Sequence, residues 1–244
     1  MSGVAVLIVG WQLVSSTNQT FHGLMPTVPD VFGAFLDLVT TPSVRSDMLV
    51  TMERIAVAFM VGEIIGSIAG FAMATSSIAA QSAGPLVRLT YSLPKTAIYP
   101  LVLLWLGIGD SSIVAVAALG AGVPAAIHAR DGARAVDPTL KMAGRALGAS
   151  RLDIARTVVL PGSLPYVLTG MRMSYASATI ITLSAEMIAA SNGIGTLVTL
   201  YGNAGAFADM FGAILLIAIV AYAFDRVLSG IRRRQLRWMA AGEQ

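Results

Sequence analysis

Four long stretches of this chain contain no Asp, Glu, Lys or Arg: residues 64–87, 111–129, 173–185 and 210–224. A helix needs about 20 mainly apolar residues to cross about 30 Å of hydrocarbon, and these stretches reach or approach that length. Only 12% of the 244 residues are charged, whereas soluble domains carry about a quarter. The sequence therefore predicts an all-α, polytopic membrane helical bundle.

About six transmembrane helices are expected, and residues 1–244 are expected to form a single transmembrane domain. The spans are placed near residues 1–16, 49–75, 85–107, 111–130, 162–190 and 207–230. Pro94 and Pro100 should kink the third span. Residues 17–47 form a polar loop, within which apolar residues at helical spacing predict an interfacial helix over Pro29–Thr40.

Three glycines in the second span, Gly62, Gly66 and Gly70, are spaced four residues apart. Small residues at this spacing let two helix backbones approach closely. We expect these glycines to pack inside the bundle, and a contact between subunits is the alternative.

The distribution of basic residues predicts the orientation in the membrane. Eleven of the 16 Lys and Arg residues lie in two places: six between residues 130 and 156, in and just before an insert between two spans, and five between residues 226 and 237 in the C-terminal tail. Cytoplasmic loops carry an excess of Lys and Arg. The insert and both termini are thus expected in the cytoplasm and loop 17–47 outside. The basic character follows from topology, so no nucleic acid is expected as a partner.

The insert, residues 136–161, has the local signals of two short helices. Asp137 and Pro138 are typical of a helix start, and Gly148 is typical of a helix stop. Ser150 and Asp153 suggest a capping box for a second helix, which Pro161 is expected to end. One face of the first helix carries Leu140, Ala143, Gly144 and Leu147. Such a surface suits docking to a soluble partner, and a solvated linker between spans is the alternative.

This insert resembles the EAA loop of permease subunits of bacterial ABC importers, written EAA-x3-G-x9-I-x-LP. Aligning Gly148 with the motif glycine places Val158 at the Ile position and Leu160-Pro161 at LP. The phrases VDPTL, LGASR, VVLPGSLPYVLTGMR and AEMI are similar to the nitrate/sulfonate/taurine type. The three EAA positions fall on Met142, Ala143 and Gly144, so Met142 replaces the usual Glu and a polar contact is in doubt.

The resemblance implies a type I ABC importer permease that imports a small solute delivered by an external binding protein. It also implies a bacterial cytoplasmic (inner) membrane location, two cytoplasmic ATPase subunits and a second permease chain, most simply a homodimer. The implied ATPase-coupling residues are Asp137, Leu140, Lys141, Met142, Ala143, Gly144, Arg145, Leu147, Gly148, Ala149, Ser150 and Pro161. No enzyme activity and no cofactor are expected in this chain. ATP and Mg are expected on the partner ATPases, because neither Lys95 nor Lys141 follows a phosphate-binding GxxxxG.

Charges within the spans mark candidates for the solute path, since a charge at bilayer depth usually faces a cavity or a partner. We expect Glu63, Glu186 and Arg172 as path residues, with structural pairing as the alternative. An autonomous secondary transporter or channel could also carry buried carboxylates. An intramembrane serine hydrolase would have to use Ser163 and His128. With two histidines far apart in the sequence, no metal site is expected.

Overall fold

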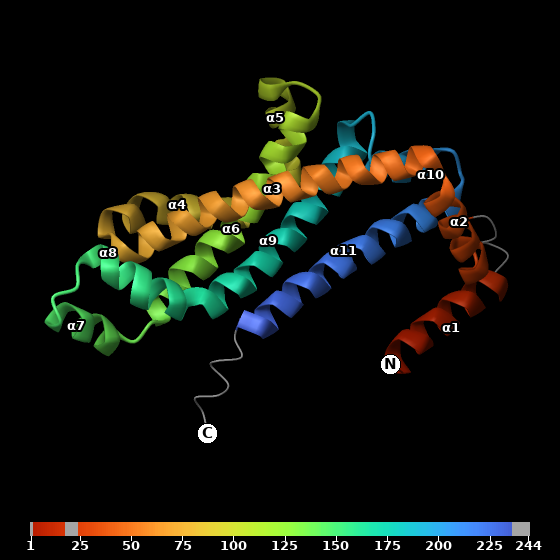
Figure 1. Cartoon of the computed structure of the whole chain (residues 1–244). Coiled ribbons are helices and arrows are strands. Elements are labelled where there is room, and N and C mark those ends of the chain that lie inside the picture. Colours follow the sequence, from red (N-terminus) through yellow and green to blue (C-terminus); the bar gives the residue numbers. More distant parts are fainter. Residues whose placement is uncertain (1, 18–23, 236–244) are drawn as a thin grey trace. The chain divides into compact units, whose positions relative to one another are not determined.

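The computed structural model describes residues 2–17 and 24–235, and these form helices joined by short connections (Figure 1). The described residues contain no strand. The helices are α1 Ser2–Thr17, α2 Val28–Thr40, α3 Pro42–Thr75, α4 Ser77–Ser92, α5 Lys95–Leu106, α6 Asp110–Ala135, α7 Pro138–Ala146, α8 Arg151–Ile154, a π-helical segment Ala155–Val159, α9 Leu160–Ala189, α10 Ile194–Asn203 and α11 Phe207–Gln235. The expected all-α class is confirmed.

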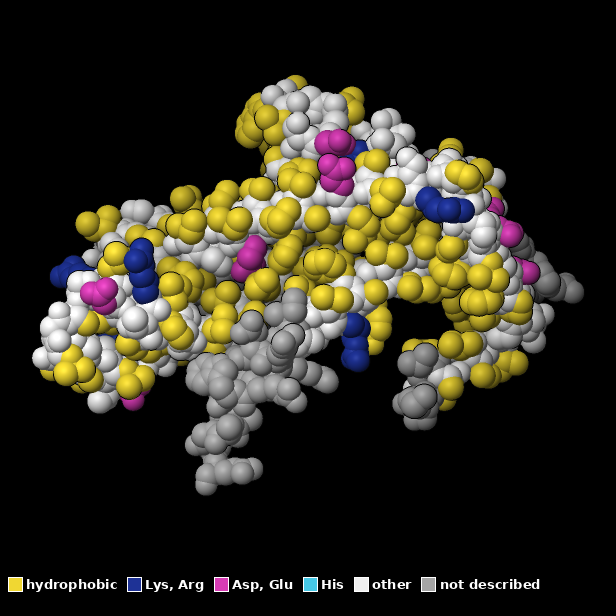
Figure 2. Space-filling model, in the orientation of Figure 1, with side chains coloured by type: hydrophobic (Ala, Val, Ile, Leu, Met, Phe, Trp, Pro, Cys, Tyr) yellow, Lys and Arg dark blue, Asp and Glu magenta, His cyan; other side chains and the backbone are white. Residues whose placement is uncertain are grey.

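Within the described residues, three helices are long and apolar enough to cross a membrane: α3, α6 and residues Phe207–Gly230 of α11. There is a fourth span if one broken helix is counted as a single span. It consists of Arg151–Ala189 and Ile194–Asn203, whose axes differ by 49° at the break between them. Apolar side chains cover the visible face of α3 (Figure 2). The expected spans near 1–16 and 85–107 correspond to α1 and to the α4–α5 pair, whose helices are each shorter.

The third expected span, 85–107, is wrong as a continuous helix. Leu93 has an extended backbone (φ −77°, ψ 136°), and Pro94 separates α4 from α5. A residue before proline is pushed out of the helical region, and proline itself has no N–H to continue the hydrogen bonding. Pro94 thus breaks this span, whereas Pro100 is accommodated inside α5.

The prediction that Pro161 ends the second insert helix is also wrong. The chain continues from α8 through the π-helical turn Ala155–Val159 into α9, with Pro161 in its first turn. In a π turn the backbone N–H donates to the carbonyl five residues earlier, instead of four residues earlier as in an α-helix. The Leu160 N–H donates to the Ala155 carbonyl, so the helix is widened just before Pro161. This leaves room for the proline ring, which in a regular α-helix clashes with the carbonyl four residues earlier.

The described residues form two compact units, one within Met1–Glu53 and Leu183–Tyr222 and the other within Arg54–Thr182 and Ala223–Gln244. In the second unit the three glycines of α3 face α6. A Cβ at Gly66 would collide with the carbonyl oxygen of Gly122, and one at Gly62 would lie 2.5 Å from that of Ala118. The predicted use of these glycines inside the bundle is confirmed, and it brings the two helix backbones together.

In the first unit, the predicted loop helix is confirmed as α2. Thr27 caps it: its hydroxyl accepts from the Asp30 N–H, and the Asp30 carboxylate accepts from the Thr27 N–H. The Trp11 indole of α1 donates to the Pro26 carbonyl at 3.0 Å and lies 5.6 Å, centroid to centroid, from the Phe211 ring of α11. These contacts fix α1 and α2 within that unit.

Candidate functional site

Helix α7 begins and ends where the sequence predicts. The Asp137 carboxylate accepts a hydrogen bond from the Thr139 N–H at 2.7 Å, and this bond lowers the pKa of Asp137. At the other end Gly148 has φ +81°. Its N–H donates to the Arg145 carbonyl, and the Ala149 N–H donates to the Gly144 carbonyl. This pair of bonds is a Schellman motif, which requires a left-handed residue at the position that Gly148 occupies.

The predicted capping box at the start of α8 is confirmed. The Ser150 hydroxyl accepts from the Asp153 N–H at 3.2 Å, and the Asp153 carboxylate accepts from the Ser150 N–H at 3.1 Å. Hydrogen bonds from the Ser150 hydroxyl and N–H lower the pKa of Asp153 below its usual range. Gly148 therefore lies between two capped helices, and the α7–α8 elbow has a defined shape.

Two contacts fix the position of α7, one with α6 and one with α8. The Lys141 ammonium donates to the Ala133 carbonyl, in the last turn of α6, at 2.9 Å, where a cation also complements the helix dipole. A Cβ at Gly144 would lie 3.2 Å from Cγ1 of Ile154. Ile154, Ala133 and Val159 form a small buried apolar cluster. Lys141 and Gly144 thus position α7, a role that the sequence did not predict.

Several apolar side chains of the elbow remain exposed instead of joining this cluster. The exposed fractions are 55% for Leu140, 88% for Leu147 and 57% for Leu152. We refer to Leu140, Ala143, Leu147 and Leu152 as the elbow surface. Beside it, Lys141, Arg145 and Arg151 contribute to the lining of a cleft of about 740 Å³. Figure 1 shows α7 and α8 beyond the end of α6. An apolar patch rimmed by polar residues is typical of a protein-interaction site.

The remaining predicted coupling residues lie along the same elbow. Met142 is 59% exposed. Ala143, Arg145 and Ser150 are exposed, and Ala149 is half-buried. Pro161, in the first turn of α9, is the one predicted coupling residue of the described chain outside the α7–α8 elbow. The structure thus brings most of the predicted set together on one elbow, and their contact with an ATPase stays a prediction.

Glu186 is almost completely buried and caps α10. One carboxylate oxygen accepts from the Gly195 N–H at 2.9 Å, and the Thr51 hydroxyl donates to the carboxylate at 3.0 Å. Thr51 also accepts from the Ile194 N–H, and Asp47 accepts from the Gly193 N–H at 2.8 Å. Carboxylates at a helix N-terminus satisfy free N–H groups and complement the dipole. The network therefore ties α3, α9 and α10 together.

Arg172 forms a bidentate salt bridge with Asp225 that links α9 to α11. Its Nε and Nη2 each donate to a different carboxylate oxygen, both at 2.8 Å. Glu63 accepts from the Ser67 hydroxyl at 3.0 Å, and its Oε2 is buried without a hydrogen-bond partner among the described residues. A path role for Glu63, Glu186 and Arg172 stays a prediction, and the structure gives Glu186 and Arg172 definite packing partners.

A further intramembrane pair was missed by the sequence reasoning. Arg54 is 4% exposed, and its Nε and Nη2 donate to Oδ1 of Asp110 at 2.9 and 2.6 Å. The two residues are far apart in the sequence, so no local pattern connects them. Each residue carried one signal of its own: Arg54 is a charge within a predicted span, which usually faces a partner or a cavity, and Asp110 is at the first position of α6, where acidic residues are favoured.

The two residues considered for a serine hydrolase make bonds within their own helices. The Ser163 hydroxyl donates to the Leu160 carbonyl at 2.9 Å, and Nδ1 of His128 lies 2.9 Å from the Pro124 carbonyl oxygen. A nucleophilic serine needs its hydroxyl hydrogen-bonded to the base. These bonds give Ser163 and His128 structural explanations.

Comparison with known proteins places this chain in one family. Residues 56–240 match the family described as binding-protein-dependent transport system inner membrane component. A taurine transport system permease protein of Escherichia coli K12 is 28% identical over 96% of this chain and 87% of its own length. A probable ABC transporter permease protein of Brucella melitensis is 30% identical over 96% and 94%. A nitrate import permease protein of Synechocystis is 24% identical over 93% and 84%.

Solved structures show the same fold at lower identity. A chain of an inward-facing methionine ABC transporter superposes with a TM-score of 0.69 at 21% identity, covering 78% of this chain and 94% of that one. A chain of a bacterial ABC transporter for alginate import gives 0.70 at 14% identity, covering 94% and 89%. The family match, the relatives and the fold all indicate a transport permease with apolar membrane spans. The chain therefore belongs to the inner membrane components of binding-protein-dependent transport systems and is a permease subunit of an ABC importer.

Proposed function

We propose that this permease carries a small anionic or zwitterionic solute of the nitrate, sulfonate or taurine class across a bacterial cytoplasmic membrane. Relatives named for taurine, aliphatic sulfonate and nitrate transport align over at least 93% of the chain. Their solutes share a compact oxyanion group. An external binding protein delivers the solute, and the elbow and both termini face the cytoplasm.

The α7–α8 elbow is the proposed contact with the ATPase, and the exposure of Leu147 carries this proposal. A leucine that is 88% exposed in a stretch held rigid by caps on both sides is poorly explained by a solvated linker. Burying one leucine side chain contributes about 1.5–3 kcal/mol, so Leu140 and Leu147 could supply much of a docking contact. Met142 lies beside them, where the family motif usually has Glu.

Two such permease chains, most simply identical, would form the solute path with one ATPase subunit on each elbow. ATP and Mg would be bound and hydrolysed by the ATPases. Closure of the ATPases would push on both elbows, and Lys141 and Gly144 would transmit that push to α6 and α8 through the contacts described above. The whole chain would act as one permease domain.

The test is purification of the tagged chain from its native membrane in mild detergent, with quantification of the ATPase that co-purifies. Leu147→Asp should reduce the ATPase recovered at least about tenfold, because a charge would have to be buried at the contact. Leu24→Asp makes the same chemical change at another exposed leucine, in the loop proposed to lie outside, and should change nothing. Equal recovery with Leu147→Asp and wild type would contradict the proposed contact. Recovery of wild type without any ATPase would favour an autonomous transporter.

A further inference from the structure

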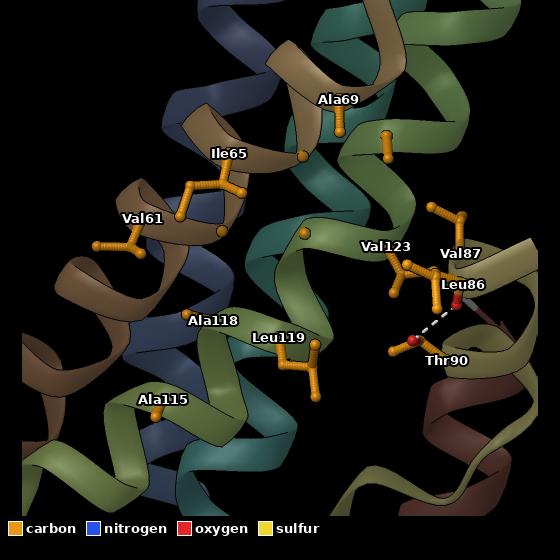
Figure 3. Close-up of a pocket in the computed structure, with 14 residues that line it drawn as sticks. Val61, Ile65, Ala69, Leu86, Val87, Thr90, Ala115, Ala118, Leu119 and Val123 are labelled. Carbon is orange, nitrogen blue, oxygen red and sulfur yellow. Dashed lines mark hydrogen bonds between the residues drawn. The ribbon is translucent and has the colours of Figure 1, made fainter. Parts of the chain in front are cut away.

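Helix α4 has two chemically different faces at membrane depth. Leu86, Val87 and Thr90 line an apolar groove of about 410 Å³ between α4, α3 and α6. Figure 3 shows their side chains in this groove, with Thr90 hydrogen-bonded back to Leu86. The same groove is lined by α6 residues from Ala115 to Ala126, which lie in the middle of the Asp110–Ala135 helix. This part of α4 is therefore level with the middle of a membrane span.

The opposite face of α4 is polar. At 100° per residue, Arg88 points about 150° away from the mean direction of the three groove residues. Four polar residues fall within an arc of about 60° around it, and all four are exposed: Ser77, Gln81, Arg88 and Ser92. We call these four residues the α4 stripe. A Cβ at Gly84 would lie 3.7 Å from Nη1 of Arg88, so the guanidinium lies along the helix surface.

The stripe has a positive charge that the neighbouring sequence does not neutralise. Residues 76–109 contain Arg88 and Lys95 and no Asp or Glu. No ion pair of Arg88 is found among the described residues, whereas Arg54 and Arg172 are both paired with aspartates. An exposed guanidinium at mid-membrane depth costs several kcal/mol against lipid. Arg88 must therefore face water or a polar partner.

The break that follows the stripe supports an aqueous surrounding. Leu93 and Pro94 interrupt the span, and the Lys95 ammonium donates to the Tyr91 carbonyl at 3.0 Å. Irregular backbone at membrane depth is tolerated where it is buried in protein or lines a water-filled cavity. In transporters, broken helices of this kind provide charged and polar ends for ionic solutes. The polar stripe and the break lie on one element.

We propose that the α4 stripe lines the water-filled solute path and that Arg88 contacts the oxyanion group of the solute. A guanidinium matches sulfonate and nitrate oxygens with two parallel N–H donors, and its positive charge complements the negative charge of the oxyanion. This assignment of the contact rests on the proposed solute class. The aqueous position of the stripe does not, and the two parts are tested separately.

The natural chain has no cysteine, so single cysteines can be labelled in the assembled transporter in membranes. The probes are the sulfonate-bearing and the trimethylammonium-bearing ethyl methanethiosulfonates. Gln81→Cys, on the stripe, should react with both at least about tenfold faster than Leu86→Cys, on the groove face of the same helix. Equal rates at the two positions would overturn the aqueous position of the stripe.

Arg88 should also set the charge preference of this labelling. Positions 81 and 88 are about 10 Å apart along the helix. Coulomb's law over that distance, at an effective dielectric constant between about 80 and 20, gives a rate effect of about 2- to 15-fold. Adding Arg88→Gln to Gln81→Cys should slow the sulfonate reagent by this factor and speed the cationic one. Arg45→Gln, which removes an exposed cation from the first turn of α3, should change neither. An unchanged ratio with Arg88→Gln would overturn the role of Arg88.

Transport completes the test with taurine, ethanesulfonate and nitrate as solutes. Arg88→Gln should lower uptake at least about tenfold while the ATPase still co-purifies, and Arg88→Lys should keep a measurable part of the uptake and the full anionic labelling preference. Wild-type uptake by Arg88→Gln would overturn the proposed solute contact. If wild type imports none of the three solutes, the proposed solute class fails, and the labelling result still decides whether Arg88 attracts anions in an aqueous path.

Discussion

Gly148 offers the sharpest test of how the elbow works, because its backbone and its lack of a side chain can be separated. Its φ is +81°, and a Cβ built on it meets nothing within 4 Å. The cost of Gly148→Ala therefore arises from the left-handed backbone, about 1–2 kcal/mol for an L-residue. That cost would shift the elbow away from its capped shape by a factor of about 5 to 30.

If the ATPase binds only the capped shape, its apparent affinity for Gly148→Ala should fall by up to the same factor. Gly148→Asn should cost less, since Asn tolerates this conformation better than other non-glycine residues. The assay is titration of the purified ATPase onto the detergent-solubilised permease, followed by binding and by ATPase stimulation. The order Gly, then Asn, then Ala is expected for affinity. Equal weakening by Ala and Asn would refute the backbone argument and would indicate that any side chain blocks the contact.

Other perturbations probe the packing and the charges. Gly66→Ala should destabilise the solubilised chain by about 1–3 kcal/mol through overpacking against α6, seen as a lower midpoint of thermal unfolding. Gly33→Ala, where a Cβ meets nothing within 4 Å, is its control, and equal midpoints would contradict the packing. Arg172→Asp should destabilise the chain, and adding Asp225→Arg should recover about 1 kcal/mol of the free energy of unfolding, since the ion pair is partly exposed. A double-mutant cycle with no coupling energy would contradict a stabilising ion pair between the two residues. Asp153→Asn should reduce hydrogen-exchange protection at the start of α8. The folded-state pKa of Asp153 is lowered, so its stabilisation is present above the unfolded pKa of about 3.9 and is lost as pH falls through the folded value. Below the folded-state pKa of Asp153, the hydrogen-exchange protection of Asp153→Asn and of wild type should therefore be equal. A difference that persists at that pH would contradict the role of the carboxylate in capping α8.

Features set by residues close in sequence were predicted well. Asp137, Gly148 and the Ser150–Asp153 box each act within one helical turn, and the structure has all three. The glycines of α3 were also predicted correctly, because the spacing itself creates a surface that only a close neighbour can fill. Pro161 shows the limit of local rules, since a π-helical turn upstream removes the conflict that normally stops a helix at proline.

The candidate site was predicted as a segment, and the roles within it were not. Lys141 was grouped with the partner-contacting residues, yet its ammonium binds a carbonyl of α6. Nothing in the local sequence distinguishes a lysine that reaches back from one that reaches out. Glu186 was singled out because a carboxylate in a span is rare, but its partners Thr51 and Gly195 come from different segments. Such long-range pairing depends on the fold.

Pairing within the fold also changes which intramembrane charge matters for transport. Arg54 and Arg172 each meet an aspartate, and Glu186 accepts hydrogen bonds at the start of α10. A charge already satisfied in this way has little remaining capacity to bind a solute without breaking its own structure. Arg88 lies exposed on a polar helix face, in a region without acidic residues. Rarity in a span identified Glu63, Glu186 and Arg172 as candidates, and the absence of an internal counter-charge among the described residues adds Arg88 to them. A transported anion supplies that counter-charge for the duration of its passage, which keeps binding reversible.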